Sequence, residues 1–209
     1  IINRQPSTDN HQPKIMIAII DYDAGNVKSV QNALKKLGFE AVITSDIETI
    51  KNADKVIFPG VGEASSAMKK LQERGLDAVI PNLKQPVLGI CLGMQLMCNA
   101  SEEGNTKALG IFDCEVKLFP NSDIVPHMGW NNVADIKGKL LENISENDNF
   151  YFVHSYYAEI CESTTSVCDY ITPFSATLEK DNFYAAQFHP EKSGDAGFKL
   201  LENFLNLRF

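Results

Sequence analysis

The amino-acid sequence predicts an α/β fold, a doubly wound and mainly parallel sheet with an antiparallel extension in the second half of the chain. Three observations lead to this prediction. Short apolar runs alternate with segments of helical periodicity in the first half. These runs are apolar throughout, as in strands that are covered on both faces. From Cys114 to Phe188 the helical periodicity disappears, and short strands and turns replace it.

The composition is that of an ordinary globular protein. Of the 209 residues, 44% are hydrophobic and 22% are charged. The net charge of −8 argues against binding to nucleic acid through a basic face, and no apolar run is long enough to cross a membrane. The cysteines form no C-x-x-C pair and no cluster with histidine, so we expect free thiols in a cytoplasmic protein with neither a metal ion nor a cofactor. They are Cys91, Cys98, Cys114, Cys161 and Cys168.

The folded part is expected to follow a leader. Residues 1–13 are polar and aperiodic, which predicts a disordered leader or cloning remnant, so that a single domain spans 14–209. An apolar strand covers 14–21, and a polar turn covers 21–26. The next helix has an apolar face and ends at Gly38. That face consists of Val27, Val30, Leu34 and Leu37.

Three more strands complete the parallel part of the prediction, at 41–44, 55–58 and 86–90. A helix over 63–74, which ends at Gly75, separates the last two. Ligands bind beyond the carboxyl ends of parallel strands. Two segments stand at such ends, the loop Pro59-Gly60-Val61-Gly62 and the candidate nucleophile Cys91.

In the second half, three apolar segments predict antiparallel strands that extend the edge of the main sheet, at 115–119, 150–154 and 184–188. A final helix is predicted over 196–207, because this segment offers a continuous apolar face. The face consists of Phe198, Leu201, Phe204 and Leu205.

The segment Gly89-Ile90-Cys91-Leu92-Gly93 has the pattern of a nucleophile elbow with cysteine in place of serine. A nucleophile on a tight strand-to-helix turn has a strained backbone, and the two glycines remove side chains that would clash there. The turn would aim the start of a helix at the sulfur, which favours the thiolate, and would leave the Leu92 N–H free to bind an oxyanion. The alternative is a buried structural cysteine between two packing glycines.

An effective oxyanion hole needs a second donor, and the Val61 N–H is the natural candidate. Gly60 and Gly62 flank Val61, so the Gly60–Val61 peptide can rotate at little steric cost. When the Val61 N–H points inward, the oxyanion hole has both donors. When the Gly60 carbonyl points inward instead, the hole lacks its second donor. We therefore expect a loop that a bound partner switches on. The alternative is a loop in which the glycines only make a tight turn.

The segment Gln187-Phe188-His189-Pro190-Glu191 supplies a candidate base and its orienting acid. In an extended segment residues i and i+2 point the same way, and Pro190 stiffens the link between them. Glu191 can then fix the tautomer of His189 while the other ring nitrogen faces the thiol, as nucleophilic catalysis requires. The alternative is a structural turn with His189 as a bystander, which the cysteine elbow makes less attractive.

Four more residues have two interpretations each. Gln95, one helical turn after Cys91, contacts a substrate or is a polar helix residue. His154 ends an apolar strand and is a catalyst or, as we expect, a satisfied core histidine. Trp130 belongs to the core or to a protein interface. Lys192 is a solvated charge or a contact to a partner.

Three motifs resemble the class I, or triad, glutamine amidotransferase family: the loop 59–62, the elbow 89–95 and the segment 187–191. The resemblance covers essentially the whole chain after residue 13. It implies a flavodoxin-like α/β domain that hydrolyses L-glutamine and releases ammonia. The same kind of fold also carries cysteine-based redox sensors and binding modules, in which Cys91 would be oxidised. A sensor thiol, however, has no need of a histidine that an acid orients.

The resemblance assigns roles to the residues of these motifs. Cys91 would attack the side-chain amide of glutamine and form a thioester, His189 would move protons, and Glu191 would orient the imidazole. Val61 and Leu92 would form the oxyanion hole. The contacts to the substrate would come from Gly60, Gln95, Ser155 and Tyr156.

Three further segments resemble the glutaminase subunits of imidazole glycerol phosphate synthases: 21–26, 126–131 and 154–156. In the first, Asp23 and Ala24 replace the Gly-Met or Gly-Val of the pattern, with little chemical consequence. This resemblance implies a heterodimer in which ammonia passes to a (β/α)8-barrel cyclase that makes imidazole glycerol phosphate and AICAR in histidine biosynthesis. The residues expected to face this partner are Trp130, Asn131 and Lys192. The alternative is a glutaminase that feeds another synthase.

Overall fold

The computed structural model describes residues 15–23 and 25–208. The predicted leader, 1–13, lies outside the described residues, and the extent of the single domain stays a prediction. In the first half of the chain strands and helices alternate, as expected. The elements are β1 (Ile17–Ile20), α1 (Val27–Lys36), β2 (Ala41–Thr44), α2 (Ile47–Asn52), β3 (Lys55–Gly60), α3 (Ala64–Glu73), α4 (Leu76–Val79), η1 (Ile80–Asn82), β4 (Val87–Cys91) and α5 (Leu92–Leu96).

The second half consists mainly of short strands, and a long helix ends it. The elements are β5 (Ala100–Ser101), η2 (Glu103–Asn105), β6 (Thr106–Lys107), β7 (Glu115–Leu118), β8 (His127–Asn132), β9 (Asn149–His154), β10 (Tyr156–Ala158), β11 (Thr164–Tyr170), β12 (Thr172–Lys180), β13 (Phe183–Ala186), η3 (Pro190–Lys192) and α6 (Gly194–Asn206).

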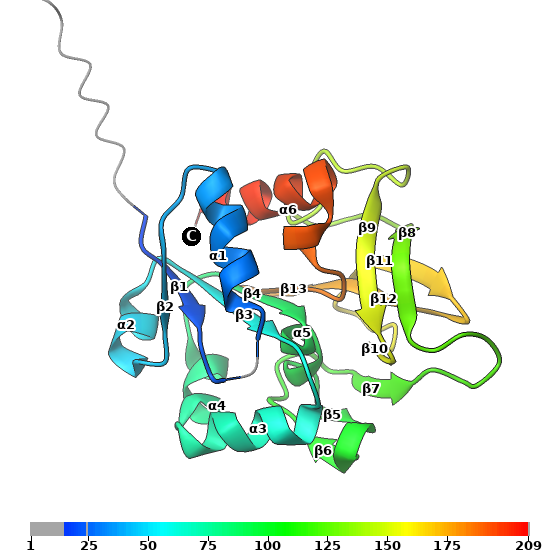
Figure 1. The fold of residues 1–209 in the computed structure, drawn as a ribbon, viewed down its shortest axis with the longest axis horizontal. Coiled ribbons are helices and arrows are strands. Elements are labelled where there is room, and N and C mark those ends of the chain that lie inside the picture. Colours follow the sequence, from blue (N-terminus) through cyan, green and yellow to red (C-terminus); the bar gives the residue numbers. More distant parts are fainter. Residues whose placement is uncertain (1–14, 24, 209) are drawn as a thin grey trace, which may run out of the picture.

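A seven-stranded sheet with the order β11-β12-β13-β4-β3-β1-β2 forms the centre of the molecule (Figure 1). The strands from β13 to β2 in this order are parallel to one another, whereas β11 and β12 are antiparallel to their neighbours. Helices cover both faces of the sheet. The predicted doubly wound, mainly parallel sheet with antiparallel strands is therefore confirmed.

The main sheet separates two apolar cores, and β1 contributes to both. Ile17 and Ile19 point to one face, where they pack with buried residues of α1 and α6. Ala18 and Ile20 point to the other face, which α3, α4 and α5 cover. All four side chains are fully buried, as the unbroken apolar run predicts. Burial on both faces is what fixes the sheet between its two helical layers.

The predicted strand partners in the second half were partly wrong. The segment predicted at 115–119 forms β7 in a separate four-stranded sheet, β10-β7-β5-β6, and the segment at 150–154 forms β9, which pairs with β8 alone. The segment at 184–188 does join the main sheet, but β13 is parallel to β4. The pattern of apolar residues predicts a strand but does not determine which strand it pairs with. Here two successive reversals, at Ile171 and Asp181, both with positive φ, turn β13 back into the direction of β4.

Local signals placed the helix ends well and missed two short helices, α2 and α4. Gly38 and Gly75 have the left-handed conformation that ends a helix, with φ of 85° and 68°. The short helix α2 was not predicted, although Asp46 caps it by accepting a hydrogen bond from the Thr49 N–H at 2.8 Å. In α6 the buried face includes Leu200, whereas Phe198 is only partly buried.

The helix α5 packs closely on the ends of β3 and β4, because Gly93 leaves room on the side of β3 and Gly89 on the side of β4. A Cβ atom at Gly93 would overlap the carbonyl oxygen of Phe58 in β3. A Cβ atom at Gly89 would lie 2.7 Å from the Met97 sulfur and 3.0 Å from the Met94 nitrogen. The first clash is with backbone, which cannot move aside without breaking the sheet.

We expect Gly93→Ala to lower the free energy of unfolding by about 3 kcal/mol or more, because the added methyl group meets the Phe58 carbonyl. The control is Gly38→Ala, where nothing lies within 4 Å and only the positive φ opposes a side chain. That strain costs about 1–2 kcal/mol. Urea unfolding of the two variants measures the difference. Equal losses would contradict the close packing of α5 on β3.

Candidate active site

Cys91 stands at the turn between β4 and α5, the position of an elbow nucleophile. Its backbone has φ 54° and ψ −111°, a strained conformation for a residue with a side chain. The packing of α5 on β3 holds the turn in this conformation. Strain of this kind persists only where the surroundings enforce it, and here it presents the sulfur to a pocket.

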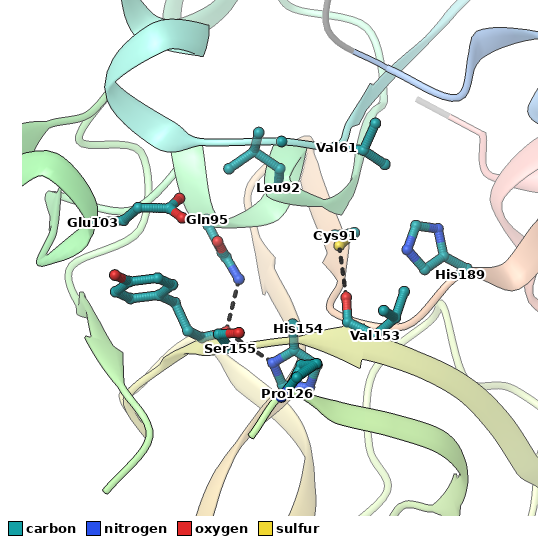
Figure 2. Close-up of a pocket in the computed structure, with 12 residues that line it drawn as sticks. Val61, Cys91, Leu92, Gln95, Glu103, Pro126, Val153, His154, Ser155 and His189 are labelled. Carbon is teal, nitrogen blue, oxygen red and sulfur yellow. Dashed lines mark hydrogen bonds between the residues drawn. The ribbon is translucent and has the colours of Figure 1, made fainter. Parts of the chain in front are cut away.

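His189 follows β13 and lies beside Cys91 (Figure 2). Its Nδ1 is 2.9 Å from Oε1 of Glu191, and the two side chains are only 2% and 1% exposed. The backbone of His189 is fixed as well. Its N–H donates to the Tyr151 carbonyl at 2.9 Å, and its carbonyl accepts from the Ser193 hydroxyl at 2.6 Å. With Nδ1 engaged by Glu191, Nε2 is the ring nitrogen left for the sulfur.

Glu191 reaches His189 by a route that the sequence analysis did not predict. Residues 190–192 form the 3₁₀ turn η3, so the rule for an extended segment does not apply. Pro190 begins this turn, where its fixed φ is favourable and its missing N–H costs nothing. The turn folds the carboxylate of Glu191 back onto the imidazole. Asn26, at the start of α1, donates to the same oxygen of Glu191 at 3.5 Å.

The pKa of His189 reflects these neighbours. Burial by itself lowers it, but the interactions with the neighbouring Cys91 sulfur and Glu191 carboxylate, together with their negative charges, outweigh burial and raise the pKa to about 10. The imidazole is therefore protonated at neutral pH. An imidazolium beside a cysteine stabilises the thiolate, which is the reactive form of a thiol.

Gln187 is a buried contact of the nucleophile that the sequence analysis missed as a site residue. Its Nε2 lies 3.8 Å from the Cys91 sulfur, and its Oε1 accepts from Nε2 of Gln95 at 3.0 Å. Gln95 also donates to the Tyr156 carbonyl at 2.8 Å. The signal was available, because Gln187 is two residues before His189.

A pocket of about 340 Å³ opens in front of Cys91 and His189 (Figure 2). Five residues predicted for the oxyanion hole or the substrate line it: Val61, Leu92, Gln95, Ser155 and Tyr156. Gly60 does not line the pocket; it is buried at the end of β3, where it pairs with Cys91. The other lining residues are Gly62, Glu103, Pro126, Val153 and His154.

Glu103 brings a carboxylate to the pocket, and the sequence analysis did not single it out. Its Oε2 accepts a hydrogen bond from the Ala64 N–H at 2.8 Å. Burial raises its pKa, the bond from Ala64 lowers it, and the nearby charge of Glu63 raises it again; the balance is upward. Glu103 lies in η2, between two very short strands, and no motif marks it.

His154 is a satisfied buried histidine, as predicted, and it also lines the pocket. Its Nδ1 donates to the Tyr156 carbonyl at 2.8 Å, so its Nε2 accepts from Nδ1 of His127 at 3.1 Å. Burial lowers the pKa of His154 to about 3 and that of His127 to about 4. Both imidazoles are therefore neutral at pH 7.

The three residues predicted to face a partner lie outside the pocket. Trp130 is exposed on β8, so it does not belong to the core. Its ring makes an edge contact with Tyr151 on β9, and the Lys192 ammonium lies 5.9 Å from the centre of the same Tyr151 ring. Asn131 is partly buried, and its amide donates to the Asp169 carbonyl at 3.3 Å.

Within residues 15–23 and 25–208, no three histidine, cysteine or acidic side chains are grouped so that they could hold a metal ion. In the same part of the chain, no helix is long and apolar enough to cross a membrane.

Comparison with protein families decides the assignment of the chain. Residues 18–207 match the family model described as "Glutamine amidotransferase class-I". The chain belongs to this family. Two solved structures of low sequence identity share the fold of this class-I amidotransferase. One is a glutamine amidotransferase with a TM-score of 0.70 and 18% identity, and the match covers 90% of this chain and 96% of that one. The other is PurLQS from Thermotoga maritima with a TM-score of 0.70 and 16% identity, and the match covers 92% of this chain and 98% of that one.

Curated relatives place this amidotransferase close to one kind of subunit. It is 59% identical over 194 residues to the imidazole glycerol phosphate synthase subunit HisH of Bacteroides fragilis, which covers 91% of this chain and 99% of the relative. It is 49% identical over 200 residues to subunit HisH 2 of that synthase from Methanococcus maripaludis, with coverage of 91% and 98%.

The buried His154 predicts a loss of stability in acid. An unfolded histidine takes up a proton below about pH 6.5, whereas His154 in the folded amidotransferase stays neutral down to about 3. Because the unfolded state then binds more protons, stability falls as the pH falls. Between pH 7 and pH 5 we expect the free energy of unfolding to fall by about 2 kcal/mol more in the wild type than in His154→Gln, which cannot titrate.

Urea unfolding of both proteins at the two pH values measures this difference. The substitution changes stability at pH 7 as well, so the change between the two pH values is the informative quantity. Equal changes in the two proteins would show that His154 is not held neutral by the fold.

Proposed function

We propose that this chain is the glutaminase subunit of an imidazole glycerol phosphate synthase, which hydrolyses L-glutamine and supplies ammonia to a cyclase subunit for histidine biosynthesis. The observation that carries the proposal is the position of His189, whose Nδ1 contacts Glu191 and whose ring lies beside Cys91 in the same pocket. The strong similarity to HisH subunits supports the choice of synthase. The cytoplasmic location stays a prediction.

The first chemical step is attack of the Cys91 thiolate on the side-chain carbonyl carbon of glutamine. A carbon–sulfur bond forms, and the carbonyl electrons move to oxygen. The carbon–nitrogen bond then breaks, and protonated His189 gives its proton to the leaving nitrogen as general acid. Ammonia departs and a γ-glutamyl thioester remains on Cys91.

The second step is hydrolysis of the thioester. His189, now neutral, removes a proton from water, and the water oxygen attacks the thioester carbon. Collapse of the second tetrahedral intermediate releases glutamate and returns the thiolate beside the imidazolium. Glu191 keeps Nδ1 protonated through both steps, so that Nε2 always faces the reacting atoms.

Both tetrahedral intermediates carry negative charge on oxygen. The Leu92 N–H follows directly after the nucleophile, and Val61 lines the pocket beside it. We propose these two N–H groups as the oxyanion donors. One such donor typically lowers the barrier by about 3 kcal/mol. The orientation of the Gly60–Val61 peptide therefore controls a large share of the rate.

The pocket suits an amino acid with a charged head group. Of its lining side chains, Glu103 is the carboxylate, which makes it the natural partner of the α-ammonium group of glutamine. The backbone of Ser155 and Tyr156 is proposed to hold the α-carboxylate. Gln95 is fixed by Gln187 and by the Tyr156 carbonyl, so it holds that side of the pocket in place.

The two-stranded sheet β8–β9 offers a surface for the proposed (β/α)8-barrel cyclase. Met128 and Trp130 are both exposed on β8 and pair with Val153 and Tyr151 of β9. Val153 also lines the pocket, and its carbonyl lies 3.9 Å from the Cys91 sulfur. An apolar face that borders the ammonia source is suited to the partner that consumes ammonia.

Cys91→Ser tests the nucleophile. In the complex with the cyclase we expect glutamine hydrolysis to fall about a thousandfold or more, since a hydroxyl is a much weaker nucleophile in a site built for a thiolate. Synthase activity with added ammonium salt should remain, because only the ammonia source is lost. The control is Cys161→Ser, a half-buried cysteine outside the pocket. Glutamine turnover retained by Cys91→Ser would overturn the mechanism.

Glu103→Gln tests the substrate contact. Loss of the charged pair should raise KM for glutamine about tenfold or more and change kcat little, since the ammonium group is bound equally in the ground and transition states. The control is Glu102→Gln, the preceding residue, whose carboxylate accepts from the Leu118 N–H and does not line the pocket. An unchanged KM in Glu103→Gln would show that the head group binds elsewhere.

A further inference from the structure

Tyr22 carries a buried hydroxyl group for which the described part of the chain offers no hydrogen-bond partner. The residue is 1% exposed, and its hydroxyl has no hydrogen-bond partner among the described residues. A polar group that is buried without a partner loses its bonds to water and gains none in return. Such a group needs an explanation, and for a hydroxyl beside a movable peptide one explanation is a second state of the protein in which a partner is present.

The Tyr22 hydroxyl lies against the loop proposed to complete the oxyanion hole. A Cβ atom on Gly60 would lie 2.5 Å from the hydroxyl oxygen, so the oxygen touches the backbone of Gly60. The Tyr22 ring packs on Phe58 in β3, with 5.4 Å between the ring centres. The hydroxyl is therefore held against Gly60 by a ring that is itself fixed in the core.

Tyr22 is not part of the pocket wall. Val61 lines the pocket, whereas Tyr22 belongs to the apolar core. The carbonyl and the N–H of one peptide group point in opposite directions. When the Val61 N–H turns into the pocket, the Gly60 carbonyl therefore turns away from the pocket.

We propose that Tyr22 is a positioning residue for the oxyanion hole: its hydroxyl donates a hydrogen bond to the Gly60 carbonyl when the Val61 N–H faces the pocket. The bond is absent in the state described here, which leaves the hydroxyl unpaired. Rotation of the Gly60–Val61 peptide therefore gives the Tyr22 hydroxyl a partner and at the same time completes the oxyanion hole. The partner subunit then needs less binding energy to hold the loop in its active state. The proposal rests on the proposed glutaminase function.

The chemistry of Tyr22 suits a donor. Burial raises the pKa of its phenol, and the nearby negative charge of Cys91 raises it further. The group therefore stays protonated, and it can give a hydrogen bond without taking part in proton transfer. Gly60 must be glycine for this contact, because any side chain would fill the position that the hydroxyl occupies.

The test compares Tyr22→Phe with Tyr184→Phe. Tyr184 is the matched control, since its hydroxyl is also buried and unpaired but lies in the other core, in β13. Each full-length variant is assembled with the cyclase and saturated with imidazole glycerol phosphate. We expect kcat for glutamine hydrolysis to fall about three- to tenfold in Tyr22→Phe, the size of one hydrogen bond. KM should not change, and Tyr184→Phe should match the wild type.

Two further measurements separate a positioning role from a structural one. Alkylation of Cys91 by iodoacetamide forms no oxyanion, so its rate in the complex should be the same in all three proteins. Thermal unfolding of the isolated chain should show no loss of stability in Tyr22→Phe, because the resting hydroxyl has no bond to lose.

Three outcomes would overturn the proposal: an unchanged kcat in Tyr22→Phe, an equal fall of kcat in Tyr184→Phe, or slower alkylation of Cys91 in Tyr22→Phe. A loss of thermal stability in the isolated Tyr22→Phe chain would also overturn it, because the hydroxyl would then already have a partner. A wild-type complex that does not hydrolyse glutamine would instead refute the proposed function.

Discussion

Backbone contact between α5 and the end of β3 is the constraint on which the site depends. Gly93 lies on the Phe58 carbonyl, and Gly60 leaves no space for a side chain next to the elbow. This contact holds Cys91 at a positive φ and sets the oxyanion loop beside the nucleophile in the same step. A side chain at either glycine would separate the two halves of the site. The geometry of the sulfur and of its proposed oxyanion donors is therefore one property of the fold.

The histidine side of the site is held by different means. There the anchors are hydrogen bonds, from the His189 N–H to the Tyr151 carbonyl and from the Ser193 hydroxyl to the His189 carbonyl. The bond to Glu191 fixes the imidazole ring of His189, and the side chains of both residues are buried. The nucleophile is thus positioned by close packing and the base by polar contacts. Both depend on the parallel pairing of β4 with β13, which brings two distant segments together.

Much of this arrangement was predictable from sequence because it depends on local signals. The glycines around Cys91, the helix-ending Gly38 and Gly75, and the spacing of His189 and Glu191 act over a few residues, and the structure has them where expected. Long-range choices were not predictable. Three features depend on tertiary packing, which the spacing of residues along the chain does not reveal. They are the separate sheets that contain β7 and β9, the position of Glu103 in the pocket, and the contact of the buried Tyr22 hydroxyl with Gly60.

The location of Glu103 has a consequence for how such a protein can evolve. The triad is attached to the main sheet, but this carboxylate comes from η2 in the small β5–β6 excursion and is tied to the start of α3 by one hydrogen bond. Insertions, deletions or substitutions in the β5–β6 segment can therefore occur without any change to the nucleophile elbow or to the segment that carries His189.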